Sequence, residues 1–185
     1  LSRPSMTDPR QCTLAGAVTL EGPGVHSGLA AVLTLRPAEP GTGIRFKRTA
    51  LVDAPEIPAT LEHVVGTDLA TSLGVGSTTV LTVEHVLAAL SGGGVDNVTL
   101  ELSGPEPPIR DGSFQDYVQA VASVGVVEQD APARVIEVKE PLTVDCESGA
   151  SYVVVPADSF RLSTTIQFAH PEIGRQYGSF EITPE

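Results

Sequence analysis

A short apolar run with helical spacing constrains the fold of this chain more than any other segment. Residues 81–90 read LTVEHVLAAL, and three glycines follow at positions 92–94. Four apolar side chains recur at the spacing of one helical face, namely Val83, Val86, Leu87 and Leu90. Thr82 is placed to cap the first turn, and the glycines end the run abruptly. The pattern predicts a short helix, from 83 to 90, that packs on a sheet.

The adjacent pair Glu84 and His85 lies inside this run. An apolar helix should be largely buried, and burying an unpaired carboxylate is costly, so Glu84 needs a cation, a metal-bound water or a protonated group beside it. A neutral imidazole is a good zinc ligand, and a nearby carboxylate can take a proton from zinc-bound water. Taken alone, the pair is weak evidence for such a site and favours a plain alternative: His85 as a hydrogen-bonded core residue and Glu84 as a surface residue.

Composition narrows the class of protein. The chain has 185 residues, 41% of them hydrophobic and 18% charged, which fits one or two folded domains. Its 11 basic and 23 acidic residues give a net charge of −12, which argues against non-specific nucleic-acid binding. The basic residues cluster only at Arg45, Lys47 and Arg48, within a predicted edge strand at 43–48, and this cluster is interpreted as an ordinary solvated face.

Cysteine usage and hydropathy suggest a compartment. Cys12 and Cys146 are far apart and match no zinc-finger or redox spacing, so we expect a reduced, cytoplasmic protein. No apolar stretch reaches the length of a membrane-spanning helix, and no transmembrane segment is predicted. Residues 1–10 are predicted to form a flexible leader.

Alternating and β-branched segments predict strands at 13–20, 30–36, 43–48 and 97–102, and a second amphipathic helix at 114–124 that Gly125 closes. Between the first two strands, the glycine-rich loop 21–28 can bring backbone amides and His26 close to a ligand. A plain hairpin connection with an exposed His26 is an equal alternative.

A second strand-rich pattern begins near Ala133, with predicted strands at 134–138, 142–144, 151–155 and 163–168. Residues 31–38 and 151–157 each form an apolar strand ending in Pro-Ala, and each precedes a strand that ends near a phenylalanine. This weak self-similarity suggests a duplicated unit whose second copy has strands but no helices. We therefore predict a first α+β domain at 11–128 and the strand portion of an incomplete second domain at 131–185.

Seven motifs occur in order between about Gln11 and Pro171. They are Gly22-x-Gly24-Val25-His26-Ser27-Gly28, Leu33-Thr34-Leu35-Arg36-Pro37-Ala38, Gly41-Thr42-Gly43-Ile44, residues 82–90, Gly94-Val95-Asp96-Asn97, Pro108-Ile109-x-Asp111-Gly112-Ser113 and Phe168-x-His170-Pro171. Together they resemble the zinc-dependent UDP-3-O-acyl-N-acetylglucosamine deacetylases of lipid A synthesis. The resemblance implies an α+β fold of two similar domains, each a sheet layered on helices, with the active site between the helices.

The resemblance also implies roles for individual residues. His85 matches the first zinc ligand and Glu84 the general base of the deacetylase. His26 matches a residue of the substrate pocket, and Leu69 and Thr71 lie in the segment that matches the pocket wall beside the metal. The implied cofactor is zinc and the implied substrate is UDP-3-O-acyl-N-acetylglucosamine. Asp111 belongs to a family motif, but we expect it to order the loop before the second helix.

The chain departs from the family pattern in one large respect. The remaining zinc ligands of the family, a His and an Asp one helical turn apart, have no counterpart here, and three further functional residues of its second domain are also missing. A catalytic zinc normally has three protein ligands, and the other histidines, His26, His63 and His170, sit in separate loops and strands. Three interpretations stay open: an N-terminal portion of the deacetylase that is inactive without a complementary C-terminal chain, a non-catalytic binding or regulatory protein that retains the first domain, or an unrelated α+β domain.

Overall fold

The computed structural model describes residues 9–183, which divide into two compact units. The first unit ends at Arg134 and the second begins at Val135. Residues 1–8 of the predicted leader lie outside the described residues, whereas Arg10 already begins a strand. The predicted domain boundaries at 128 and 131 stay a prediction.

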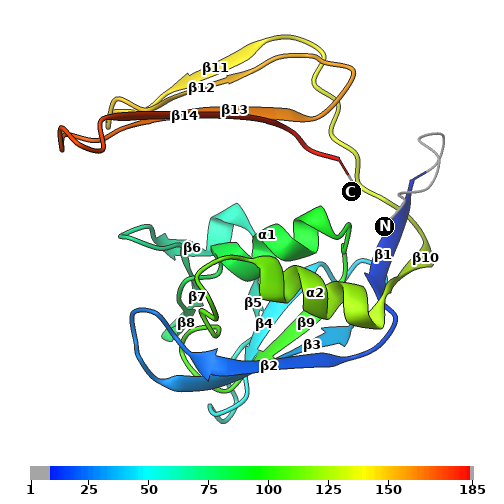
Figure 1. Ribbon diagram of the computed structural model, residues 1–185. Helices are drawn as coiled ribbons and strands as arrows, with labels where there is room; N and C mark the ends of the chain where they lie inside the picture. The colour runs from blue at the N-terminus through cyan, green and yellow to red at the C-terminus, as the bar shows by residue number, and fades with distance from the viewer. Residues whose placement is uncertain (1–8, 184–185) are drawn as a thin grey trace. The chain divides into compact units, whose positions relative to one another are not determined.

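The first unit is a sheet covered by two helices (Figure 1). The sheet contains five strands, in spatial order β2 (Val18–Pro23), β3 (Ala30–Pro37), β9 (Val98–Leu102), β4 (Ile44–Arg48) and β5 (Ile57–Pro58). Neighbouring strands are antiparallel except β4 and β9, which are parallel. The helices are α1 (Glu84–Gly92) and α2 (Gln115–Val124). The chain is therefore an α+β protein, as the sequence predicted.

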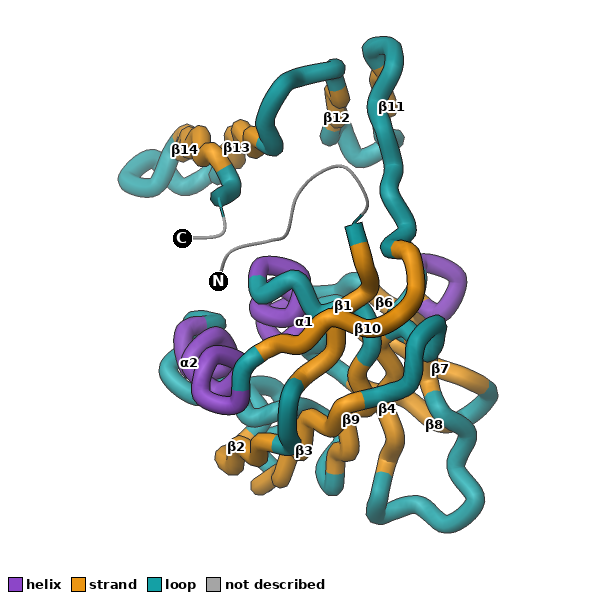
Figure 2. Tube along the Cα trace, turned by 90° about the vertical axis from the view of Figure 1, so that its right-hand side faces the viewer, coloured by secondary structure: helices purple, strands orange, loops and turns teal. Residues whose placement is uncertain are grey.

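Two smaller sheets flank this layer (Figure 2). One has three strands, β6 (Val64–Gly66), β7 (Ser72–Val75) and β8 (Thr78–Val80), which follow the 3-10 turn η1 (Leu61–His63). The other pairs β1 (Arg10–Leu14) with β10 (Val126–Pro132). The predicted single strand at 13–20 is wrong, because β1 and β2 belong to different sheets. The chain turns between them, where the Ala15 amide donates to the Gly125 carbonyl at 2.9 Å.

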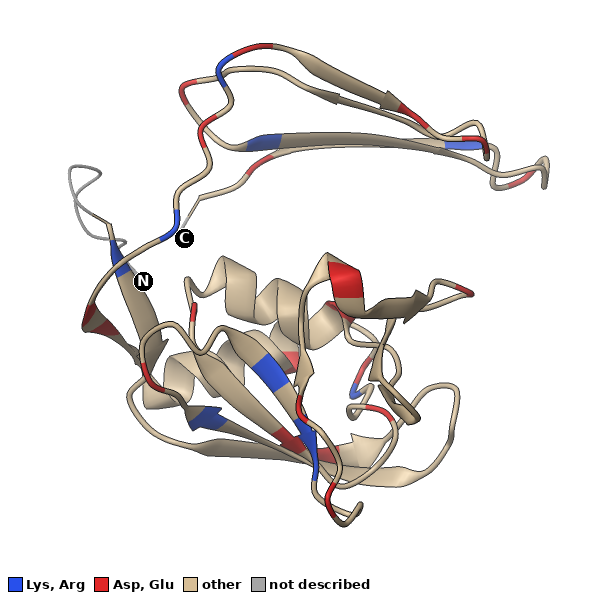
Figure 3. Cartoon of the chain, turned by 180° about the vertical axis from the view of Figure 1, so that it is seen from behind, with Lys and Arg blue, Asp and Glu red and all other residues tan. Residues whose placement is uncertain are grey.

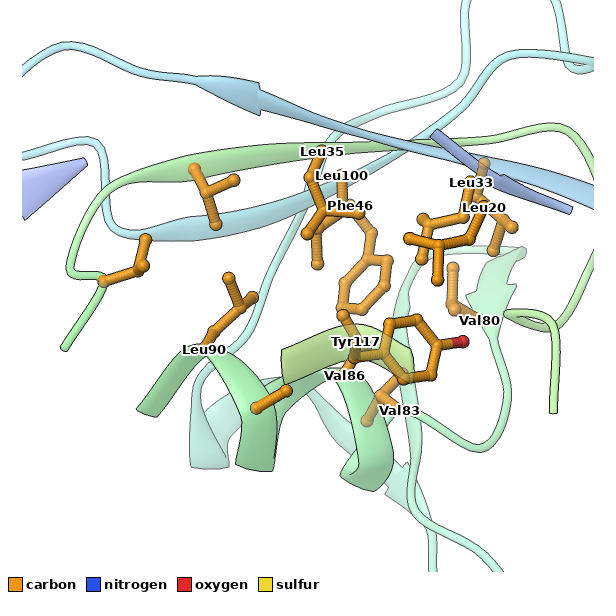
Figure 4. Packing of buried hydrophobic residues seen from close by; sticks show 14 of the residues in the cluster. Leu20, Leu33, Leu35, Phe46, Val80, Val83, Val86, Leu90, Leu100 and Tyr117 are labelled. Carbon is orange, nitrogen blue, oxygen red and sulfur yellow. The ribbon is translucent and has the colours of Figure 1, made fainter. Parts of the chain in front are cut away.

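The core lies between the five-stranded sheet and the helices. Side chains on β3 and β9 alternate, so that one face of the sheet is buried through Leu33, Leu35, Leu100 and Leu102. The helices contribute Val83, Val86, Leu90, Tyr117 and Val121 to the same cluster, and the rings of Phe46 and Tyr117 lie between the layers (Figure 4). The helical spacing read from the sequence thus identified the buried face of α1, where Leu87 alone is only half-buried.

Two local predictions in this unit are wrong. Thr82 does not cap α1, because its hydroxyl bonds to Glu106 and the cap position is Val83. Strand β4 is not an edge strand, since it lies between β9 and β5. One of its basic residues, Arg48, donates a hydrogen bond to the Thr79 carbonyl at 2.8 Å.

Acidic residues predominate along the whole chain. Asp and Glu outnumber Lys and Arg in both units (Figure 3).

The second unit consists of two antiparallel hairpins. β11 (Leu142–Asp145) pairs with β12 (Ser151–Val154), and β13 (Arg161–Gln167) pairs with β14 (Arg175–Glu181). The predicted strand at 134–138 is not formed, and residues 134–139 have no regular structure. All residues of these four strands are exposed except Gly178, which is half-buried. The strands predicted near 142–144, 151–155 and 163–168 are formed, whereas β14 was not predicted, and the described residues of this unit include no helix. The origin of the unit by duplication stays a prediction.

We predict that the second unit exchanges its amide hydrogens much faster than the first. Two-stranded hairpins with both faces in water are only marginally stable, whereas β3 and β9 are buried in a packed core. Hydrogen–deuterium exchange of the dilute monomeric chain should show β11–β14 fully exchanged while the amides of β9 are still protected. Equal protection of β9 and β13 would show that the second unit is stable by itself.

Candidate active site

The chain enters α1 through a strained turn. After β8, Thr82 adopts φ 53°, a left-handed conformation that β-branched residues rarely take, and its side chain is buried. Helical bonding begins at Val83, whose carbonyl accepts from the Leu87 amide at 3.1 Å. Glu84 and His85 are then the first two residues of α1, and both are half-buried. The turn therefore brings the acid and the imidazole to the rim of the core instead of its centre.

Thr71 lies directly against this turn. Its amide donates to Glu84 Oε2 at 3.1 Å, and its carbonyl accepts from the Val83 amide at 3.2 Å. These two bonds join the segment before β7 to the first turn of α1. Leu69, two residues earlier, is 93% exposed and has φ 60°. The structure thus brings Thr71 and Glu84 together and leaves the Leu69 side chain open to solvent.

The His85 imidazole has an unsatisfied buried atom. Within residues 9–183, no hydrogen-bond partner meets Nδ1 of His85, although this nitrogen is inaccessible to solvent. Buried polar side-chain atoms without a partner are uncommon in folded proteins and need an explanation. The imidazole suits zinc, but no three His, Cys, Asp or Glu side chains gather as a metal site in the described part of the chain. His85 therefore fits the role of one metal ligand and does not form a complete site with its neighbours.

His26 reaches the same region through its backbone. It lies on the loop between β2 and β3, with its side chain exposed. Its amide donates to both carboxylate oxygens of Glu106, at 3.1 and 3.2 Å, and the Ser27 amide donates to Oε2 at 2.8 Å. The Thr82 hydroxyl donates to Glu106 Oε1 at 2.6 Å. Glu106 thus connects the loop of His26 to the turn before Glu84.

Sequence reasoning did not identify Glu106 as a functional residue. It follows β9 in a proline-rich loop and is fully buried. Burial raises the pKa of its carboxyl group, but hydrogen bonds from Thr82, Ser27 and His26 outweigh burial and hold that pKa below its ordinary value. The available signal was an acidic residue between prolines, at Pro105 and Pro107, where a solvated charge would have been expected in a flexible loop.

The other singled-out residues have hydrogen-bond partners in their own loops. Asp111 Oδ1 accepts from the amide and the hydroxyl of Ser113, at 2.9 and 2.8 Å, so it orders the loop before α2 as predicted. His63 Nδ1 bonds to the Thr60 hydroxyl at 2.8 Å, at the 3-10 turn. His170 Nδ1 accepts from the Glu172 amide at 3.3 Å, in the second unit.

Comparison with known proteins decides the family. The family model described as LpxC, UDP-3-O-acyl N-acetylglycosamine deacetylase, matches residues 11–185. The chain belongs to this deacetylase family. A UDP-3-O-acyl-N-acetylglucosamine deacetylase of Myxococcus xanthus is 47% identical over 181 residues, covering 97% of this chain and 56% of the relative. One from Thermosynechococcus vestitus is 46% identical, covering 92% of this chain and 59% of the relative.

The family members differ in length from this chain. A bifunctional enzyme LpxC/FabZ of Chlorobaculum tepidum is 40% identical over 95% of the chain, which corresponds to 38% of that protein. The chain therefore spans little more than half the length of the single-function deacetylases that it matches. Among the described residues, neither helix is long and apolar enough to cross a membrane.

Proposed function

We propose that this chain is the N-terminal portion of a cytoplasmic, zinc-dependent deacetylase. The reaction would remove acetate from UDP-3-O-acyl-N-acetylglucosamine in lipid A biosynthesis. The observation that carries the proposal is the pair Glu84 and His85 at the start of α1, where His85 Nδ1 is buried without a hydrogen-bond partner among residues 9–183. Membership in the deacetylase family and the names of the relatives support the same substrate.

His85 would hold the zinc ion as one of three protein ligands. The other two ligands would come from outside residues 9–183, in the part of the relatives that this chain does not match. When bound, zinc supplies a Lewis acid that polarises the acetamide carbonyl and lowers the pKa of water.

Glu84 would act as the general base. Its carboxylate takes a proton from the attacking water, and the oxygen of that water bonds to the acetamide carbon. The C–N bond then breaks as the proton held by Glu84 passes to the leaving nitrogen, which gives acetate and the sugar amine. The Thr71 amide holds Glu84 Oε2 at 3.1 Å, which leaves Oε1 to receive the proton. Thr71 therefore fixes the base while the proton moves.

His26, Leu69 and Thr71 would contact the substrate. The His26 ring is exposed on a loop that Glu106 fastens to the turn before Glu84. Leu69 offers an exposed apolar side chain two residues from Thr71. Both side chains are open to solvent in this chain and would be covered when the substrate is bound.

The experiment that tests the proposal measures acetate release by a complemented enzyme. We define the complemented enzyme as this chain joined to the C-terminal part of the Myxococcus xanthus relative, the part that the chain does not match. It should release acetate from UDP-3-O-acyl-N-acetylglucosamine, whereas this chain alone and the C-terminal part alone should not. A folded, zinc-loaded complemented enzyme without acetate release would refute the proposed activity and favour a binding or regulatory role.

A further inference from the structure

Glu106 is a fully buried carboxylate whose hydrogen-bond donors are all uncharged. Three of these donors are the amides of His26 and Ser27 and the hydroxyl of Thr82, and the Ser27 hydroxyl also interacts with the carboxylate. No ion pair in residues 9–183 includes Glu106. Taking a carboxylate out of water without a cation costs several kcal/mol, and here the hydrogen bonds from these donors offset that cost and hold the pKa of Glu106 below its ordinary value. A glutamine or an apolar residue at this position would leave some of these donors without an acceptor.

The surrounding backbone closes on this side chain. A Cβ added at Gly24 would lie 2.3 Å from Glu106 Oε2, so only glycine lets the loop approach so closely. The backbone of the segment that carries Glu106 is also hydrogen-bonded to the segment before α1 and to the end of β2, where the His26 loop begins. The Pro105 carbonyl accepts from the Leu81 amide at 3.0 Å, and the Ile109 amide donates to the Pro23 carbonyl at 2.9 Å.

We propose that Glu106 is a positioning residue, which holds the His26 loop and the first turn of α1 in one fixed arrangement. Oε2 of Glu106 accepts from the amides of His26 and Ser27, and Oε1 accepts from the Thr82 hydroxyl. The role of this arrangement rests on the proposed function, because His26 would bind the substrate and Glu84 would activate the attacking water. Misplacement of such groups by about 1 Å can lower a rate by roughly 100-fold.

Thr82 is the point where this connection acts on the catalytic pair. Its left-handed backbone is unfavourable and persists only because surrounding contacts hold it. The bond to Glu106 at 2.6 Å is one of these contacts, and Glu84 follows only two residues later. Loss of the bond should let the turn relax and move Glu84 and His85 away from the loop of His26.

The substitution Glu106→Gln tests the connection with little change of volume. A glutamine has one acceptor oxygen and one amide group that only donates, so it cannot accept from all three donors. Thr82→Val removes a single hydroxyl donor at nearly the same shape, and Thr82→Ser restores that donor. Glu101→Gln is the matched control, because Glu101 is a partly exposed carboxylate that pairs with Arg36 at 2.6 Å.

The first arm uses this chain alone and does not depend on catalysis. Hydrogen exchange of the His26 and Ser27 amides should be roughly 10- to 100-fold faster in Glu106→Gln, with Glu101→Gln unchanged. If Glu106→Gln does not fold, Thr82→Val carries this arm: the amide resonances of His26 and Ser27 should shift, and Thr82→Ser should return them. Unchanged protection in folded Glu106→Gln, or unchanged resonances in Thr82→Val, would overturn the proposal.

The second arm is a double-mutant cycle in the complemented enzyme. Glu106→Gln should lower kcat/KM by roughly 10- to 100-fold, and adding it to His26→Ala should lower kcat/KM by a smaller factor, because the part of the loss that acts through His26 is already gone. Glu101→Gln should leave the His26→Ala value unchanged. If the losses of kcat/KM caused by Glu106→Gln and His26→Ala multiply in full in the double variant, Glu106 does not act through His26 and is merely structural. Failure of the proposed function would give a different result from failure of this proposal, because the unsubstituted complemented enzyme would then release no acetate.

Discussion

The complemented enzyme carrying His85→Ala should lose its zinc and its acetate release together. A catalytic zinc site has about three protein ligands, so removing one leaves a site that binds the metal weakly. The loss of zinc affinity should exceed the roughly 10- to 100-fold that follows when only a hydrogen-bond partner of a ligand is removed. Alanine is a strong helix former, so α1 should persist in this variant. Elemental analysis for zinc and an acetate assay on the same sample measure both effects.

His63→Ala is the matched control for this variant. His63 lies at the 3-10 turn, where its Nδ1 already bonds to the Thr60 hydroxyl. Its removal should change neither the zinc content nor the activity. Tight binding of one zinc per molecule by His85→Ala would contradict the assignment of His85, and loss of zinc in both variants would indicate a general effect on folding.

Glu84→Ala should lower turnover by roughly 10²–10⁴-fold, the usual contribution of a general base, while the zinc content stays nearly the same. The two residues are adjacent on α1 but have different surroundings. Glu84 accepts a hydrogen bond from the Thr71 amide, whereas His85 has a buried nitrogen without a partner in residues 9–183. The proposed base and the proposed metal ligand should therefore be separable by substitution, although they are neighbours in the sequence.

Glu62→Ala is the control for the loss of one carboxylate. Glu62 is exposed on the 3-10 turn, so its substitution should leave turnover and zinc content unchanged. If Glu84→Ala also lost its zinc, the carboxylate would organise the metal site and its assignment as a base alone would be wrong.

Periodicity in the sequence predicted the elements that local patterns determine. The apolar positions of residues 83–90 fall on one face of α1, and Val83, Val86 and Leu90 are buried as expected. The alternation of β9 likewise predicted which of its side chains enter the core. These patterns succeed because burial of one face repeats with the period of the element itself.

Features that depend on contacts between distant segments were not predictable in this way. The run 13–20 is uniformly suited to a strand, yet its two halves pair with β10 and β3 in different sheets. Threonine is a residue type that often caps helices, but the Thr82 hydroxyl donates to Glu106, which lies 24 residues further along the chain. Long-range partners override local preference at both positions.

The candidate site likewise contains residues that local patterns reveal and residues that only distant contacts reveal. Glu84 and His85 are noticeable in the sequence because they interrupt an apolar helix. Nothing local indicates that Thr71 bonds to Glu84 or that Glu106 fastens the His26 loop, since each contact joins segments that only the fold brings together. The residues proposed to carry out the reaction can thus be read from the chain, while those that hold them in place cannot.

The most direct test of the central claim is the turnover per bound zinc of Glu84→Ala in the complemented enzyme. Zinc content and acetate release should be measured on one sample and compared with the unsubstituted enzyme. We predict about one zinc per molecule in both, with turnover per zinc lower in Glu84→Ala by roughly 10²–10⁴-fold. Near-full turnover in Glu84→Ala with zinc bound would contradict the role of Glu84 as the general base and leave its carboxylate with a structural role only.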